Sequence, residues 1–175
     1  MLLDVRKIRG ARERVDRTFQ PSAFPGAAED YVIAGPVSLA ADVHKDTDRY
    51  RLTGRVRAPL DLTCSRCLEA FRLDVDAPFD LQYVPHAENA GEGEVAIEED
   101  DLSTAYYRDE VIDLGQLVRE QCYLALPMKP LCSEGCKGLC PTCGTNLNTA
   151  TCECATTWED PRLAGLKALL NKDEK

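Results

Sequence analysis

The sequence predicts an α+β protein, in which an antiparallel β domain is followed by a helix and a cysteine-rich, zinc-binding C-terminal module. Much of the first hundred residues alternates between apolar and polar side chains, as strands do when one sheet face lies on a core. One long helical pattern follows, and most of the cysteines come after it. These observations divide the chain into a β domain at 1–84, an acidic loop at 85–110 and a helical, metal-binding part at 111–175.

The strands are predicted from alternating apolar residues. The first series covers 37–43 and ends at the turn-forming residues Asp46-Thr47-Asp48. Further series cover 50–56, 60–62, 71–75 and 79–83. Because no strand–helix–strand alternation is present, we expect an antiparallel meander rather than a parallel sheet.

The acidic loop is predicted from charge. The chain has a formal net charge of −9, and residues 84–113 alone hold ten acidic side chains against Arg108. Glycine and glutamate are frequent there and large apolar residues are few, which is typical of an exposed segment. It is either a solvating surface loop or a docking strip for a basic partner such as a ribosomal protein.

Two helices are predicted. The run DLGQLVREQCYLAL, residues 113–126, has apolar residues at the helical period, with Asp113 as its N-cap and Gln116 completing a variant capping box. Pro127 ends this helix. A second helix begins at Asp160-Pro161 and presents a leucine stripe from Leu163 to Leu170.

The cysteines carry the strongest chemical signal. Cys122 falls on the apolar side of the first helix and is expected to be a core residue. The other eight form four close pairs, which is what two tetrahedral four-cysteine zinc sites require. Glycine and proline between the later cysteines argue against one apolar helical stripe. The eight expected ligands are Cys64, Cys67, Cys132, Cys136, Cys140, Cys143, Cys152 and Cys154.

Four pairs can be divided between two zinc ions in three ways. Joining Cys140/Cys143 to Cys152/Cys154 closes the smallest loop and is favoured by chain entropy. Cys64/Cys67 would then meet Cys132/Cys136 and fix the sheet to the segment after the helix. The rival arrangement joins Cys64/Cys67 to Cys140/Cys143, as in a zinc ribbon.

Composition narrows the class of function. No stretch approaches the ~18–20 apolar residues of a membrane span, and the charged N-terminus is unlike a signal peptide. We therefore expect a cytoplasmic location, where thiols stay reduced, and the odd number of cysteines, nine, favours metal binding because they cannot all pair as disulfides within one chain. His44 and His86 are the only histidines, and four-cysteine zinc sites leave no position for a reactive water. We therefore expect a protein that is not an enzyme and has no small-molecule substrate.

Three stretches resemble the YceD family, which is linked to accumulation of large-subunit ribosomal RNA. They are CSRCLEAF at 64–71, VIDLGQLVREQCYLALPMKPLCSEGCKGLCPTCGTNLN at 111–148 and DPRLAGLKALL at 160–170. The resemblance implies a ribosome-biogenesis factor that acts on large-subunit ribosomal RNA, a precursor particle or a large-subunit ribosomal protein. It carries over the cysteines as signature residues and supplies no catalytic residues.

Arginines in one strand pattern are candidates for RNA binding. The face opposite the apolar residues would carry Arg49, Arg51, Arg55 and Arg57. Successive positions on that face lie ~6.6–7 Å apart along the strand. Arg66, between Cys64 and Cys67, could extend this surface or offset the charge of a zinc–thiolate site. The alternative is a solvated face with cross-strand pairs to aspartates, and the sequence pI of 4.8 is unlike that of most RNA-binding proteins. A redox-gated zinc holdase chaperone, which releases zinc on oxidation, is the alternative function.

Overall fold

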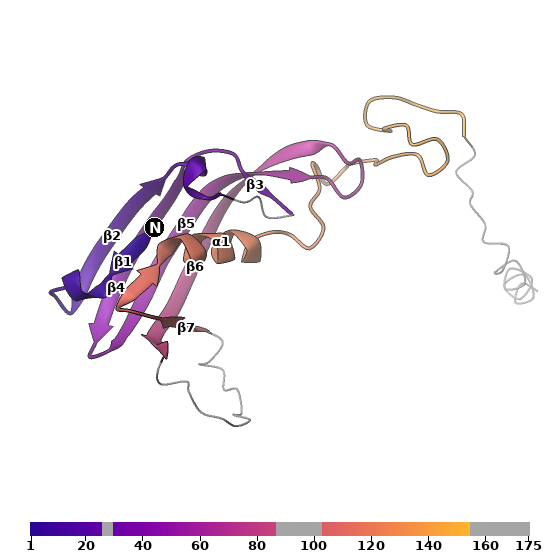
Figure 1. Cartoon of the computed structure of the whole chain (residues 1–175). Coiled ribbons are helices and arrows are strands. Elements are labelled where there is room, and N and C mark those ends of the chain that lie inside the picture. The colour runs from indigo at the N-terminus through magenta and orange to yellow at the C-terminus, as the bar shows by residue number, and fades with distance from the viewer. Residues whose placement is uncertain (26–29, 87–102, 155–175) are drawn as a thin grey trace, which may run out of the picture.

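A computed structural model describes residues 1–25, 30–86 and 103–154 (Figure 1). Its main element is a six-stranded sheet with the order β2-β4-β5-β6-β7, in which β3 also pairs with β5. A separate pair of short strands, β1 and β8, lies beside it. The strands are β1 (Leu2–Asp4), β2 (Arg12–Phe19), β3 (Val32–Ile33), β4 (Val37–Asp46), β5 (Arg49–Thr63), β6 (Ala70–Pro85), β7 (Thr104–Tyr107) and β8 (Val111–Asp113). The helices are α1 (Leu114–Leu124) and the 3-10 turns η1 (Val5–Lys7) and η2 (Pro21–Ala23).

The predicted alternation builds the centre of the sheet. In β5 the even-numbered side chains from Tyr50 to Leu62 face the core, apart from the glycine at 54, and the odd-numbered ones face away. β4, β5 and β6 pair in antiparallel register, as predicted. The series at 50–56 and 60–62 form one strand rather than two, and those at 71–75 and 79–83 likewise merge into β6. β5 and β6 are long and continuous because Pro59 and Pro78 lie within the ladder of paired residues without ending it.

The structure corrects the prediction for residues 104–107. They were expected in the acidic loop, but they form β7, and β7 runs parallel to β6. Tyr107 explains why this segment is held: its side chain is buried, its hydroxyl donates to the Asp48 carbonyl at 3.0 Å, and its ring packs edge-on against Tyr50. Expectation of a purely antiparallel sheet was therefore wrong at this edge. The remainder of the loop, 87–102, lies outside the described residues.

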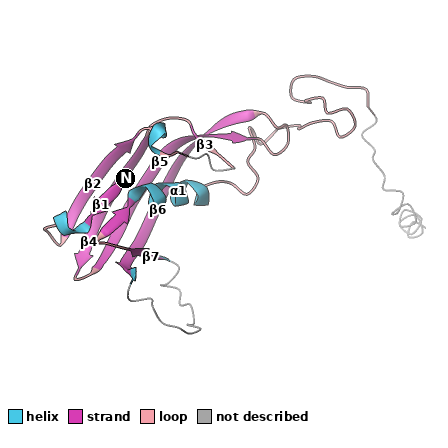
Figure 2. Ribbon diagram, in the orientation of Figure 1, coloured by secondary structure: helices cyan, strands magenta, loops and turns pink. Residues whose placement is uncertain are grey.

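Helix α1 covers the core face of the sheet (Figures 1 and 2). Asp113 caps it as predicted, because its carboxylate accepts the N–H groups of Gly115 and Gln116 at 2.8 and 3.3 Å. Gln116 does not return the bond to the cap; its amide donates to Glu120 instead, at 2.8 Å. The buried positions of α1 match the predicted apolar stripe, except that Ala125, just past the helix, is exposed. The predicted second helix at 160–170 lies outside the described residues.

The opposite face of β2, β4, β5 and β6 is exposed and rich in arginine and aspartate. After α1 the described chain contains turns and isolated bridges but no further helix or strand (Figure 2). Within the described ranges, no helix combines the length and apolar character needed to cross a membrane.

Candidate metal centres

The first cysteine pair lies at the tip of the β5–β6 hairpin. Residues 64–69 connect the two strands in a tight turn, which is closed by the Cys64 N–H donating to the Glu69 carbonyl at 2.9 Å. A second bond joins the Leu68 N–H to the Cys64 carbonyl at 3.0 Å, and Leu68 has a φ of 60°. The turn directs the side chains of Cys64 and Cys67 to the same side, where both are buried.

The chain that follows α1 docks on this tip. The Ser65 N–H donates to the Pro130 carbonyl at 2.8 Å, and the Leu139 N–H donates to the Arg66 carbonyl at 3.1 Å. Gly138, with a φ of 74°, allows this approach, because a Cβ there would lie 3.0 Å from the Arg66 oxygen. These bonds place Cys132 and Cys136 beside the hairpin tip.

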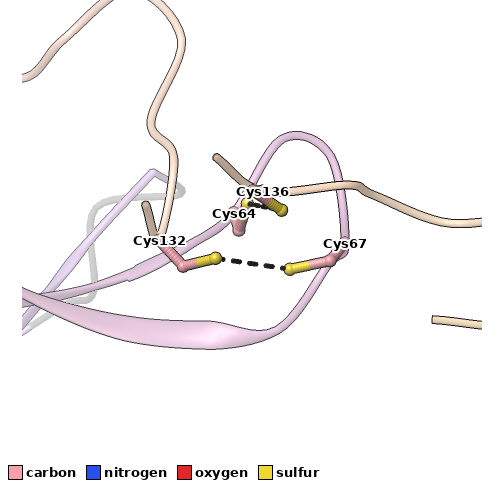
Figure 3. Close-up of side chains that lie close together, drawn as sticks. All are labelled: Cys64, Cys67, Cys132 and Cys136. Atoms are coloured by element: carbon pink, nitrogen blue, oxygen red, sulfur yellow. Dashed lines mark hydrogen bonds between the residues drawn. The ribbon is translucent and has the colours of Figure 1, made fainter. Parts of the chain in front are cut away.

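The four sulfurs of this first group, Cys64, Cys67, Cys132 and Cys136, converge (Figure 3). The Cys64 and Cys136 Sγ atoms are 3.8 Å apart, and those of Cys67 and Cys132 are 3.7 Å apart. All four sulfurs lie within 4.8 Å of one another. A tetrahedron with Zn–S bonds of ~2.3 Å has edges of about 3.8 Å, so the observed spacing fits a four-thiolate zinc site.

The second group comprises Cys140, Cys143, Cys152 and Cys154, whose sulfurs also lie within 4.8 Å of one another. The Cys140 N–H donates to the Thr145 carbonyl at 2.8 Å, and the Gly144 N–H donates to the Cys140 carbonyl at 2.9 Å. Gly144 has a φ of 73°, a conformation that glycine adopts without strain. The second group is more open than the first, because Cys143 is exposed and only Cys140 is buried.

In each group the pKa of two thiols is lowered and the pKa of the other two is raised. The backbone N–H of Cys67 lowers the pKa of Cys64 to about 6, and the hydroxyl of Thr145, 3.1 Å from Cys143 Sγ, lowers the pKa of Cys143 to about 6. The hydrogen bond with the neighbouring Cys143 sulfur in turn raises the pKa of Cys154 to about 12, because it holds the proton on Cys154, and burial and the charge of Cys143 act in the same direction. Four thiolates can share either space only when a cation balances their charge.

Comparison with known proteins supplies a family. Residues 52–170 match the family described as "Large ribosomal RNA subunit accumulation protein YceD". That match covers more than half of the chain. The protein belongs to the YceD family.

Individual relatives agree with this assignment. The chain is 32% identical over 142 residues to the large ribosomal RNA subunit accumulation protein YCED homolog 1, chloroplastic, of Zea mays, and this region covers 68% of the chain and 48% of the relative. It is 29% identical to the protein of the same name in Arabidopsis thaliana, covering 75% and 48%, and 33% identical to the uncharacterized protein YlbN of Bacillus subtilis, covering 65% and 62%. The chain thus spans about half the length of the plant relatives. No solved structure matches it.

All eight predicted ligand cysteines lie within the YceD match. The structure brings them together in the two groups that loop closure favours, and it does not join Cys64/Cys67 to Cys140/Cys143. Cys122 stands apart in the core, where burial raises the pKa of its thiol to about 11. Whether metal occupies the two groups stays a prediction.

The candidate arginines of β5 do share one exposed sheet face. The cross-strand pairs of the alternative interpretation are also present: Arg51 pairs with Asp80, and Arg55 and Arg57 both pair with Asp76. Arg66 differs from them, because its guanidinium donates to the Cys136 carbonyl at 2.9 Å at the hairpin tip. Arg66 therefore fixes the docked segment, and its expected role as an RNA contact stays untested.

Sequence reasoning missed two asparagines in the metal region. Asn148 donates from Nδ2 to Cys136 Sγ at 3.3 Å and accepts the Lys137 N–H at 2.8 Å. Asn146 donates to the Glu69 carboxylate at 3.1 Å and so links the second half of the module to the hairpin tip. The run TNLN directly after the Cys140–Cys143 turn was the available signal.

Proposed function

We propose that this YceD-family protein is a ribosome-biogenesis factor that supports the accumulation and processing of large-subunit ribosomal RNA through binding rather than catalysis. The family match carries the assignment to large-subunit RNA. The protein would act in the cytoplasm of a bacterial cell, with its cysteines reduced. Its partner is large-subunit ribosomal RNA, a precursor particle or a large-subunit ribosomal protein.

Two zinc ions would be structural in this function. Sulfur–sulfur spacing of 3.7 and 3.8 Å in the first group supports zinc as the metal, and thiolates are ligands that zinc prefers. An ion held by four cysteines has no open position for water, so the proposal assigns it no hydrolytic role. The first ion would fix the chain after α1 to the β5–β6 hairpin, and the second would close the loop between Cys143 and Cys152.

The exposed arginines of β5 would supply the contact with RNA. They lie on a sheet face that no described helix covers, and arginine suits phosphate because its planar fork carries five N–H donors. The aspartates beside them reduce the positive charge of this surface but do not use the N–H donors of every arginine. Docking on a basic ribosomal protein through the acidic segment is the alternative contact.

Deletion of the gene tests the proposal. A factor that stabilises large-subunit RNA should, when absent, lower the ratio of large- to small-subunit ribosomal RNA and shift sucrose gradients toward free small subunits. Complementation should succeed with the parent protein and with the Cys122→Ala variant, which retains both cysteine groups. It should fail with Cys64→Ser or Cys143→Ser. Unchanged subunit profiles in the deletion strain at every growth temperature would contradict the proposal.

A redox-gated holdase is the second candidate, favoured by the exposure of Cys143 in the second group. An exposed thiolate near pKa 6 is a site where peroxide can react. This function predicts rapid zinc ejection by peroxide, a gain in suppression of client aggregation, and normal subunit ratios in the deletion strain. Gradients and peroxide survival measured on one strain separate the two candidates.

A further inference from the structure

A shallow groove of about 320 Å³ lies on the exposed face of the sheet. It follows β4, whose small side chains Ser38 and Ala40 form part of its lining. Arg14 of β2 lies on one side of it, and Arg55 and Arg57 of β5 lie on the other. β2 and β5 are separated by one strand, so their backbones lie roughly 9–10 Å apart, and Arg14 lies opposite Thr53, two residues before Arg55.

Two of these arginines share one counter-charge. The Nε atoms of Arg55 and Arg57 donate to the two oxygens of Asp76, at 2.8 and 3.2 Å. Each guanidinium thus uses one of its five N–H donors, and within the described part of the chain neither uses its Nη groups. Asp74 also lies near Arg57, in an adjoining hollow, but it makes no hydrogen bond to either arginine within the described part of the chain, so the Nη donors remain available beside the groove.

Other arginines on this face are satisfied by bidentate pairs. Arg51 donates through Nε and Nη2 to Asp80, at 2.8 and 2.6 Å, and this pairing holds the pKa of Asp80 below its ordinary value. Arg72 makes the same two-bond contact with Asp61, at 3.0 and 3.3 Å. A guanidinium that already donates through both Nε and Nη2 to one carboxylate has few N–H groups left for a further anion. Neither Arg51 nor Arg72 lines the groove.

The remaining charges around the groove nearly balance. Arg14 donates through Nε to Asp16 at 3.0 Å. Asp42, which lines the groove, pairs with Arg12 at 3.4 Å. The available guanidinium donors therefore lie on the Arg55–Arg57 side, and this is a local feature, because the chain as a whole is acidic.

We propose that this groove binds phosphate groups of a single RNA strand lying along β4, with Arg55 and Arg57 as the principal contacts. This inference rests on the proposed function and deepens it by naming the ligand and the residues. Arginine Nη groups donate well to phosphate oxygens, and the hydroxyls of Ser38 and Thr53 lie in the same lining. Among the described residues no aromatic side chain lines the groove, so the proposal includes no stacking of bases there and binding would be independent of sequence. Double-stranded RNA is too wide for a groove whose floor is a single β-strand, β4.

The test compares two variants with equal loss of charge. Arg55→Gln/Arg57→Gln removes the groove contacts, whereas Arg6→Gln/Arg72→Gln removes two bidentate pairs, with Asp4 and Asp61, that lie outside the groove. Binding of a fluorescent uridine oligomer of about twenty nucleotides is followed by anisotropy across a salt titration. Loss of two phosphate contacts on a single strand lowers the salt slope by about 1.4 and weakens binding by at least about tenfold near 0.1 M salt. The matched control should change affinity by less than about threefold.

Two single substitutions test the geometry. Ala40→Leu fills the groove without altering charge and should weaken binding, whereas Asp76→Asn removes the shared counter-charge and should strengthen it. Circular dichroism and metal content establish that each variant folds. Equal weakening by the two double variants, parent affinity in Arg55→Gln/Arg57→Gln, or preference for poly-glutamate over the oligomer would each overturn the inference. A failure here, together with the expected loss of large-subunit ribosomal RNA in the deletion strain, leaves the proposed function in place, because that loss does not depend on which residues touch RNA.

Discussion

Replacing Cys67 with serine tests the first of the two cysteine groups separately from the second. Cys67 is buried at the hairpin tip, and its sulfur lies 3.7 Å from that of Cys132, a residue 65 positions later in the sequence. A serine hydroxyl stays protonated at neutral pH and is a poor zinc ligand. We expect this variant to contain one zinc ion per chain where the parent contains two.

The cost in stability follows from the loop that each group closes. By the chain-entropy relation for cross-links, a loop of about 65 residues contributes about 4 kcal/mol to the free energy of unfolding. Only eight residues lie between Cys143 and Cys152, and a loop of that size contributes about 2.5 kcal/mol. Cys67→Ser should therefore destabilise the protein by about 1.5 kcal/mol more than Cys143→Ser, although each variant loses one ion.

Elemental analysis and urea denaturation measure the two quantities on the same samples. Cys122→Ala is the matched control, because it removes a buried thiol that contacts neither group and should leave two ions in place. Two ions in Cys67→Ser, none in the parent, or loss of metal from Cys122→Ala would refute the assignment of ligands. Equal destabilisation by Cys67→Ser and Cys143→Ser would refute the loop argument alone.

Three further outcomes are expected. A chelator should remove the metal of the second group first, because only one of its four cysteines is buried against three in the first group, and a chromogenic zinc assay should show a fast phase that Cys143→Ser lacks. Gly54→Ala should lower the free energy of unfolding by about 1–3 kcal/mol, because the new Cβ would lie against the Ala40 carbonyl oxygen and 2.9 Å from Phe79; thermal denaturation without a drop in midpoint would contradict this. Asp113→Ala should cost about 1 kcal/mol through loss of the cap of α1, and Asp113→Asn should restore most of it.

Features encoded locally could be predicted from the sequence. The strand alternation of β4, β5 and β6, the cap at Asp113 and the buried face of α1 each depend on residues within one or two turns or strands. The grouping of the cysteines was favoured by loop length, and the same grouping is found in the structure.

Features that depend on distant contacts could not be predicted. β7 lies in an acidic stretch without a long alternating pattern, and it is held by Tyr107 packing on Tyr50, a residue far away in the sequence. The role of Arg66 depends on where the chain after α1 returns to the hairpin. The different hydrogen bonding of Arg51 and Arg55 also could not be predicted from the sequence, because it depends on which aspartate of β6 lies beside each arginine.

Strand β5 lines the groove and leads directly to the first cysteine group, and the separation of the groove from that group decides whether the two work independently. Arg57 and Cys64 lie seven residues apart on one extended strand, which places them about 23 Å from each other. The groove is held by core residues of β4 and β5 that are fully buried, such as Leu39 and Val56, and it makes no contact with the hairpin tip. Loss of the first metal should therefore loosen the tip without altering the groove.

Cys67→Ser protein should bind the uridine oligomer within about twofold of the parent, because its phosphate contacts are retained. If the same variant fails to restore large-subunit RNA in the deletion strain, the metal module serves a second contact that RNA phosphate binding does not supply. A parallel loss of oligomer affinity would instead show that the tip and the groove form one binding surface.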